Sequence, residues 1–453
     1  MEKLEKKIII DSVDISYEIS YPNAEVWLTI NVNSNFSGTK KGVFNIVLEK
    51  DQMKEAISIS HLFEPGKNSI DAVVRVDEAS LWYPAGIGEQ NTYELLVGIE
   101  ADNAYQDVCK RVVGICEKEI KYSHENEYLV LNNRDVFVKA CRLDSDLAGI
   151  GKWTFNRIKS ANFNSIIISH VNDYEKLDYC TEMGLIVFEA SEIISNDISK
   201  SINIDNEDID SLIQHDLGKW NSKEEYGVYC DIYRGRQLSW LIQQSRILKE
   251  CGIISIDYED VFSNNVEFYV KRAFDNIRLT YFYYDKNVSV YYVNEKKDSM
   301  PPVTLKLGVL DLKTNKITNQ VMEIDMAPMT AKSIIKINDW NLMIKEPQSQ
   351  IMTALLLDEN KKQLARSTFF ATNTKDIVFE EPEIFISKFR TGDDEWRLAL
   401  TTKGYARCLE IKCLESNCSI SDNYFDLMPN EAKEVIIKGS VKKPEIKLKA
   451  WNR

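Results

Sequence analysis

The hydrophobic residues of the chain follow two different periods, and the positions where the period changes limit the folds available to it. In the first 120 residues apolar side chains occupy about every second position, which is the period of a strand with one buried face. Residues 25–32, 42–48, 69–76 and 93–99 show this alternation. Short alternating strands with no helical stretch between them predict a β-sandwich.

The middle of the chain alternates strands with helices. Continuous apolar runs at residues 136–139, 165–169 and 185–188 predict strands that are buried on both faces. Residues 153–161 and 174–183 lie between these runs and have helical spacing. This β-α-β-α-β order predicts a parallel sheet with right-handed crossovers.

Later segments extend this α/β region before the two-residue period returns. Helical spacing at residues 236–250 and 265–274 flanks a strand pattern at 252–256, and the polar, acidic residues 194–221 predict a long loop with one helix. Alternation resumes at about Leu279 and predicts a second and a third sandwich. The predicted domains are residues 1–121, 122–276, 277–374 and 375–453.

Composition excludes several kinds of partner. The formal net charge of −14 argues against nucleic acid and anionic membranes, which both need a basic surface. We find no apolar run of about 18 residues that predicts a membrane span, and we expect no signal peptide. Nine cysteines without a Cys-x-x-Cys pair are typical of buried thiols in a reducing cytoplasm. We therefore expect a cytoplasmic protein with no cofactor, and no metal site at the evenly spaced Cys408, Cys413 and Cys418.

The most specific motif occupies residues 81–97, with the sequence LWYPAGIGEQNTYELLV. Pro84 fixes φ, Gly86 and Gly88 permit positive φ, and the aromatic side chains can cover the end of a sandwich. The motif resembles the end of the immunoglobulin-like domain that precedes the barrel in glycoside hydrolase family 2, especially in β-mannosidases. This resemblance implies a structural role for the motif rather than a chemical one.

Other segments resemble the same family in the same order. Residues 131–139 resemble the entry to the barrel, although Asn133-Arg134-Asp135 replaces the family's Asn-Gly-Lys turn. Residues 421–433 are close to the signature of the last β-mannosidase sandwich, where we expect Asp422 and Asn423 to form a turn. The remaining matches are residues 111–116, 164–188 and 269–274. The resemblance implies a multidomain β plus α/β fold in which three immunoglobulin-like β-sandwiches flank a truncated, incomplete (β/α) barrel-like unit.

The barrel-like region is too short for the family's chemistry. A complete (β/α)8 barrel needs about 250 residues, whereas roughly 140 separate Leu131 from Phe274. We also expect the family's N-terminal sugar-binding sandwich to be absent. Retaining hydrolysis needs two carboxylates about 5–5.5 Å apart, and the family presents its acid/base as an Asn-Glu pair at the end of a barrel strand. The pair Asn206-Glu207 falls in the right region but in an acidic helix start, and the nucleophile strand has no recognisable counterpart.

Four polar residues follow the predicted parallel strands. Asp144 and Asp146 follow the first strand, His170 ends the second and Glu189 ends the third. All four would lie at the C-terminal rim of the sheet, where barrel sites form, and they are our candidates for a residual ligand site. The alternative is that His170 caps the next helix and the acids are solvated loop residues.

Three tryptophans present a similar choice. Trp153, Trp220 and Trp240 could stack on the face of a sugar, but a tryptophan at helical spacing is more often part of a core.

Three functions remain open at this stage. The first is a non-catalytic relative of β-mannosidase that serves as a scaffold, partner-binding or glycan-binding protein in carbohydrate or glycoconjugate metabolism. The second is an active β-glycosidase with a rearranged or partner-completed site, in which Glu189 or Glu207 would be needed. The third is a carbohydrate-binding module that retains the rim.

The predicted sheet also implies a partner. A truncated parallel sheet has open edges with unpaired backbone groups. We expect a second copy of the chain, a heterologous protein or the acidic residues 194–230 to cover them. Another cytoplasmic protein of polysaccharide or glycoconjugate synthesis would be a natural partner, and an oligosaccharide is a further candidate ligand.

Overall fold

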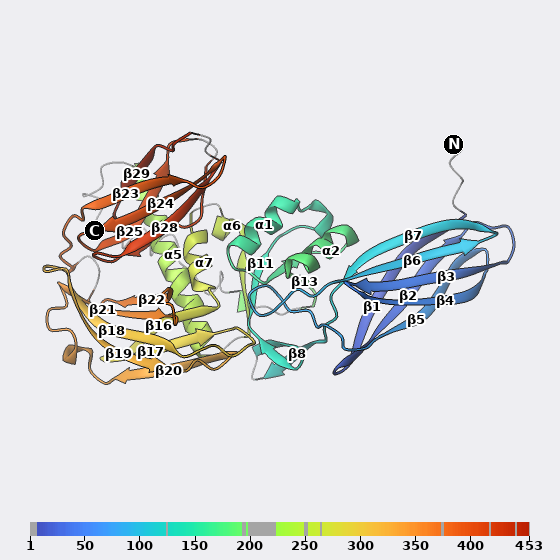
Figure 1. Cartoon of the computed structure of the whole chain (residues 1–453), viewed down its shortest axis with the longest axis horizontal. Helices are drawn as coiled ribbons and strands as arrows, with labels where there is room; N and C mark the ends of the chain where they lie inside the picture. Colours follow the sequence, from blue (N-terminus) through green and yellow to red (C-terminus); the bar gives the residue numbers. More distant parts are fainter. Residues whose placement is uncertain are drawn as a thin grey trace. The chain divides into compact units, whose positions relative to one another are not determined.

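The computed structural model describes residues 7–123, 126–192, 196–197, 223–248, 252–262, 265–372, 376–415, 418–439 and 442–452 (Figure 1). The chain divides into two compact units. One contains residues 1–197 and 251–258, and the other contains residues 198–250 and 259–453. Both units are built mostly of β-strands. None of the described helices is long and apolar enough to cross a membrane.

The first unit begins with two antiparallel sheets that enclose one core. In the first sheet the strand order is β1 (Ile8–Ser20), β2 (Asn23–Ser34) and β5 (Gly66–Val76). In the second sheet the order is β4 (Met53–Phe63), β3 (Lys40–Lys50), β6 (Tyr93–Ala101) and β7 (Ala104–Val113). Every second residue of β2 is buried, so the alternation in the sequence corresponds to one face of a sheet packed on the core. Phe44, Leu95 and Val97 are fully buried in that core.

The 81–97 motif connects this pair of sheets to the α/β region. The Trp82 indole Nε1 donates a hydrogen bond to the backbone oxygen of Thr181 at 2.9 Å, and Ala85 N donates to Gly184 O at 2.8 Å. Gly184 ends helix α2 (Tyr174–Met183) in the left-handed conformation, with φ of 77°. A Cβ at Gly184 would lie 2.7 Å from Ala85 N, so only glycine fits there. The predicted structural role of the motif is consistent with these contacts.

A buried ion pair makes a second connection between the same two regions. Arg111 on β7 donates to both carboxylate oxygens of Asp178 on α2, at 2.9–3.2 Å, and Val112 N donates to the same carboxylate at 2.9 Å. Both charged side chains are almost entirely removed from water. Because the carboxylate is fully hydrogen-bonded, the pair can remain charged in the interior.

Two more sheets complete the first unit. A small antiparallel sheet has the order β10 (Arg134–Val136), β9 (Asn126–Leu131) and β8 (Lys118–Ser123). A parallel sheet has the order β13 (Ile186–Glu189), β12 (Ser165–Ile168), β11 (Val138–Arg142), β15 (Ile253–Asp257) and β14 (Asn196–Asp197). All four residues of β12 are buried, which agrees with the continuous apolar run that predicted this strand.

The helices of this region lie between the parallel strands along the chain. Helix α1 (Lys152–Ser160) connects β11 to β12, and α2 connects β12 to β13. The predicted parallel pairing of the strands near residues 136, 165 and 185 is confirmed for β11, β12 and β13. The short 3-10 helix η1 (Leu147–Gly149) follows β11.

The described part of the second unit forms four antiparallel sheets. The first two have the orders β16 (Ile277–Tyr284), β17 (Asn287–Asn294), β20 (Thr330–Ile337) and β19 (Lys316–Ile324), β18 (Val303–Asp311), β21 (Gln350–Leu357), β22 (Gln363–Phe369). The other two have the orders β23 (Ile384–Arg390), β24 (Glu395–Thr402), β28 (Ala432–Lys438), β26 (Ser419–Ile420) and β27 (Phe425–Leu427), β25 (Ala406–Cys413), β29 (Ile446–Lys449). Each pair of sheets encloses a buried apolar core.

In the described residues of the second unit, three helices and a short 3-10 helix accompany these sheets. They are α5 (Lys223–Leu248), α6 (Tyr258–Phe262, which begins in the first unit), α7 (Glu267–Ala273) and η3 (Trp340–Leu342). Helix α5 starts at Lys223, well before the predicted residue 236. The sequence pattern missed this start because apolar and polar residues are mixed around the helix, so no helical period marks it. Helices α5 and α7 pack together beside the sheet of β16 and β17 (Figure 1).

Buried polar contacts hold α5 and α7 in place. Arg246, near the end of α5, donates to the Glu295 carboxylate at 3.0 Å and to Asp275 O at 2.8 Å, and it also bonds to Ala273 O. Glu295 follows β17 directly, so this single guanidinium joins both helices to the sheet. The predicted loop at residues 194–221 lies outside the described residues except for β14, and the predicted domain boundaries stay predictions.

Candidate functional site

The C-terminal rim of the parallel sheet contains the four residues predicted from the sequence. Ile168 pairs with Glu189 across β12 and β13, so the residues after both strands lie at one edge of the sheet. His170 Nδ1 lies 3.9 Å from Glu189 Oε2. Asp144 and Asp146 follow β11, and Asn172 Nδ2 lies 3.4 Å from Asp146 Oδ2. The structure brings His170 close to Glu189, whereas Asp146 contacts the loop after β12.

The polar atoms of this rim hold its loops together. Glu189 Oε1 accepts a hydrogen bond from Val171 N at 2.7 Å, and Leu147 N donates to His170 O at 3.0 Å. The His170 side chain is 74% exposed, and Asp144 is also exposed. An exposed histidine and a carboxylate that accepts from the backbone leave little preorganised chemistry at the rim.

The alternative role considered for His170 is wrong. The side chain of Asp173 caps α2, accepting from Lys176 N at 3.1 Å. Aspartate is favoured at this position because its carboxylate satisfies a free amide and opposes the helix dipole. An aspartate directly before the helical pattern that starts at Tyr174 is the signal that could have identified the cap.

The three candidate tryptophans do not form one site in the described structure. Trp153 on α1 is 68% exposed, with the Arg157 guanidinium 5.4 Å from its ring. Trp240 on α5 is 42% exposed and lines the pocket described next. Trp220 and the pair Asn206-Glu207 lie outside the described residues.

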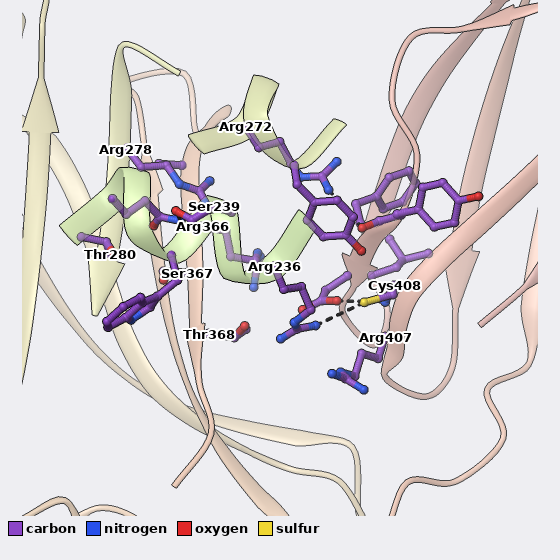
Figure 2. A pocket seen from close by; sticks show the side chains of 18 of the residues that line it. Arg236, Ser239, Arg272, Arg278, Thr280, Arg366, Ser367, Thr368, Arg407 and Cys408 are labelled. Carbon is purple, nitrogen blue, oxygen red and sulfur yellow. Dashed lines mark hydrogen bonds between the residues drawn. The ribbon is translucent and has the colours of Figure 1, made fainter. Parts of the chain in front are cut away.

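A second candidate site lies within the second unit, as a cavity of about 1010 Å³. Its walls come from α5, α7, β16, β22, β25 and the segment around β27, and Figure 2 shows ten labelled lining residues from these walls around it. Helix α5 contributes one face, because Tyr229, Tyr233, Arg236, Trp240 and Gln243 recur every three or four residues. The sequence did not predict this cavity, because its walls are distant along the chain, although the family-like segments 269–274 and 421–433 both line it.

The cavity is positively charged in a chain of strongly negative charge. Its lining has seven arginines and lysines against four aspartates and glutamates, a formal charge of +3, whereas the whole chain carries −14. The cations are Arg236, Lys271, Arg272, Arg278, Arg366, Arg407 and Lys433. A concave, partly desolvated surface with one sign of charge concentrates ligands of the opposite sign.

Some of these cations hold the walls together. Arg272 on α7 pairs with Asp422 and also donates to Asn423 O at 2.8 Å. Lys433 lies 2.9 Å from the other oxygen of Asp422, and Arg366 on β22 pairs with Glu431 through both carboxylate oxygens. Asp422 is therefore part of an ion-pair network, although the sequence suggested a turn residue.

The half-buried carboxylates of the cavity are poor general acids. Burial would raise the pKa of Asp422, but Arg272 and Lys433 outweigh it and hold this pKa below its usual range. Asp426 is half-buried, and Arg236 with the backbone N–H of Cys408 holds its pKa below the usual range. A glycosidic acid needs a raised pKa, so these groups are suited to structure rather than to proton donation.

Arg278 differs from Arg272, Arg366 and Lys433, whose side chains form ion pairs across the walls. It lies on β16, and its Nε is buried without a hydrogen-bond partner among the described residues. Burial lowers the pKa of Arg278 to about 10, although Asp275 attracts its charge. The nearby guanidinium groups of Arg272 and Arg246 lower this pKa further. The Arg278 Nε has therefore lost its hydrogen bonds to water without gaining a hydrogen bond within the described structure.

Exposed aromatic rings and hydroxyl groups complete the lining. Trp240 is 42% exposed and Tyr283 is 51% exposed, so both present ring surface to a ligand. Ser239, Ser367 and Thr368 are half-buried and add hydroxyl groups that can donate or accept. Guanidinium groups, hydroxyl groups and aromatic rings together suit a polar ligand that also has apolar faces.

Comparisons with known proteins agree with the architecture. Residues 8–115 match the family model described as glycosyl hydrolases family 2, and residues 379–452 match the mannosidase Ig-fold domain. Residues 8–115 thus match one domain of glycosyl hydrolase family 2 and residues 379–452 match a mannosidase domain, so the chain is β-mannosidase-like. No curated protein matches it in sequence.

Solved structures show the same fold as this β-mannosidase-like protein. The β-D-mannosidase of Dictyoglomus thermophilum is 14% identical, with a TM-score of 0.79; the match covers 98% of this chain and 77% of that one. The exo-chitosanase CsxA of Amycolatopsis orientalis is 10% identical, with a TM-score of 0.71; the match covers 98% of this chain and 78% of that one. At these identities the similarity concerns the fold.

Proposed function

We propose that this β-mannosidase-like protein is a non-catalytic glycan-binding protein, in which three immunoglobulin-like sandwiches flank a truncated barrel. The observation that carries the proposal is the open parallel sheet. In the described part of the chain five parallel strands form one sheet with β13 and β14 at its two ends, whereas a closed barrel has eight strands and no ends. At the rim of this sheet, the Glu189 carboxylate accepts a hydrogen bond from Val171 N and so stabilises the loop after β12.

The cavity of the second unit supports the glycan-binding part of the proposal. Its volume of about 1010 Å³ lies at the upper end of typical ligand sites. Sugars present hydroxyl groups at their edges and C–H groups on their faces. The half-buried hydroxyls and exposed aromatic rings of the cavity match both features.

Turnover of aryl glycosides tests the non-catalytic part. We expect no release of nitrophenol from 4-nitrophenyl β-D-mannoside, β-D-glucoside or β-D-glucosaminide above the rate without protein. Turnover that Glu189→Gln or Glu207→Gln abolishes would instead support an active glycosidase, the alternative function. Turnover that survives both substitutions would point to a contaminating enzyme, so each variant is purified in parallel.

We also propose that a second copy or another protein covers the outer edge of β13. This strand pairs with β12 on one side in the described sheet, and exposed backbone groups at an edge favour pairing with another strand. Light scattering at micromolar concentration should then show a dimer or, with the right partner, a heterocomplex. A strictly monomeric chain that binds no partner would remove this part of the proposal.

A further inference from the structure

We propose that the cavity of the second unit binds an anionic saccharide, and that Arg278 binds the carboxylate or sulfate group of that ligand. The inference rests on the proposed glycan-binding function and adds the charge of the ligand and the residue that recognises it. It also places the site on α5, α7, β16 and β22, away from the residues predicted at the rim of the parallel sheet.

Arg278 is a lining cation that could accommodate an anion. Its Nε is buried and makes no hydrogen bond within the described structure. Asp275 and Asp422 attract the guanidinium, but Asp422 already binds Arg272 and Lys433. A ligand carboxylate or sulfate in the cavity could accept from Arg278, which would supply the missing compensation for its buried charge.

The other cations of the cavity favour a negatively charged ligand. Arg366 and Arg272 are paired with Glu431 and Asp422, so they hold the shape of the cavity. The net formal charge of +3 in the lining attracts anions over a range of about 8–10 Å at physiological salt. Arg236, which donates to Cys408 Sγ at 3.2 Å, adds a further positive group to the wall (Figure 2).

The remaining lining favours a saccharide over a bare inorganic anion. Sulfate or phosphate alone would fill a small part of about 1010 Å³. Trp240 and Tyr283 present exposed rings within the same cavity, and a sugar face can pack against such rings while its hydroxyls meet Ser239 and Thr368. An oligosaccharide would use both kinds of surface at once.

Isothermal titration calorimetry of the full-length protein tests the proposal with four probes. Tetragalacturonate carries carboxylates, a κ-carrageenan tetrasaccharide carries sulfates, mannotetraose is neutral, and sodium sulfate is the bare anion. We expect one of the two anionic tetrasaccharides to bind at least tenfold more tightly than the neutral one and than sulfate. The comparison of carboxylated with sulfated probe identifies the source of the charge, and affinity should fall as salt increases.

Variants locate the site. Arg278→Met should weaken binding of the anionic probe about tenfold or more, because a charge-assisted hydrogen bond is lost, and Arg278→Lys should restore part of it. Arg397→Met is the matched control, since Arg397 lies on β24, outside the cavity, and pairs with Glu434 at 3.4 Å. Trp240→Ala should weaken binding, whereas Trp153→Ala should not. Thermal unfolding confirms that each variant is folded.

The outcomes separate this inference from the proposed function. Equal binding of mannotetraose and the anionic probes overturns the inference and leaves glycan binding intact. Anionic binding that Arg278→Met does not change also overturns it, because the site would then lie elsewhere. Failure of every probe to bind overturns the inference, and aryl glycoside turnover measured in parallel decides separately whether the protein is an enzyme.

Discussion

The rim of the parallel sheet and the cavity of the second unit both gather charged side chains, but they use them differently. At the rim, Glu189 accepts from Val171 N and Asp146 contacts Asn172, so these carboxylates support loops. In the cavity, the Nε of the half-buried Arg278 is removed from water and lacks a hydrogen-bond partner among the described residues. A buried polar atom without a partner calls for an explanation, and a bound ligand is one of them.

The two regions therefore differ in whether their charged groups already have partners within the described structure. The rim is where a barrel would place its chemistry, yet His170 there is largely exposed. The cavity is made by helices and strands from distant parts of the chain, and the 421–433 motif, to which the sequence assigned no ligand, forms part of its wall. Four measurements, beginning with the largest expected effect, can sharpen or break the contrast.

Arg111→Met should give the largest loss of stability, because it leaves Asp178 charged and buried without its main partner. Breaking such a pair costs about 3–5 kcal/mol, which urea unfolding followed by circular dichroism can measure. Arg75→Met is the control: Arg75 is 82% exposed and pairs with Glu25, and exposed pairs contribute about 0–1 kcal/mol. Equal effects of the two variants would show that burial of Arg111 has been misjudged.

The stability of the second unit should fall in acid because of Asp422. Its folded pKa lies below the ordinary value of 3.8, so the unfolded chain binds protons more readily than the folded one. The stabilisation by Asp422 is therefore present above pH 3.8 and is lost as the pH falls from there through the folded pKa. Urea unfolding between about pH 6 and pH 2.5 should show a weaker acid dependence in Asp422→Asn. An unchanged dependence would mean that this ion-pair network is not formed in solution.

Glu189→Ala should cost about 1 kcal/mol, because Val171 N loses its acceptor at a partly exposed site. Glu189→Gln keeps a carbonyl oxygen at the same place and should lose less. Saccharide binding should not change in either variant. Differential scanning calorimetry measures the stabilities, and a loss of saccharide affinity in Glu189→Gln would return the functional site to the rim.

Arg278→Met should change stability least, and in the direction opposite to Arg111→Met. Removing a buried charge that is incompletely compensated should leave the free energy of unfolding unchanged or raise it by up to about 1 kcal/mol. Urea unfolding without ligand measures this difference. A loss of 3 kcal/mol or more, as in a broken buried pair, would show that Arg278 is a structural cation like Arg111.

Much of the local structure could be predicted from the sequence because it follows from residue period and turn chemistry. Alternation predicted strands such as β2, and continuous apolar runs predicted β12 and its parallel neighbours, since a strand buried on both faces needs no polar side. Pro84 and the glycines of the 81–97 motif marked its structural role. The positions of Asp144, Asp146, His170 and Glu189 after parallel strands followed from the same order.

Tertiary structure decided what the sequence left open. The sequence predicted that Asp422 forms a turn. In the folded chain its carboxylate pairs with Arg272, 150 positions earlier, and with Lys433, 11 positions later. Trp240 could belong to a core or a site, and the packing of α5 against its neighbours left its ring on the wall of a cavity. Residue period reports which face of an element is buried. The compensation of a charge such as Arg278 depends on distances between segments that no local pattern records, so the sequence determined the elements and the assembled unit determined the pocket.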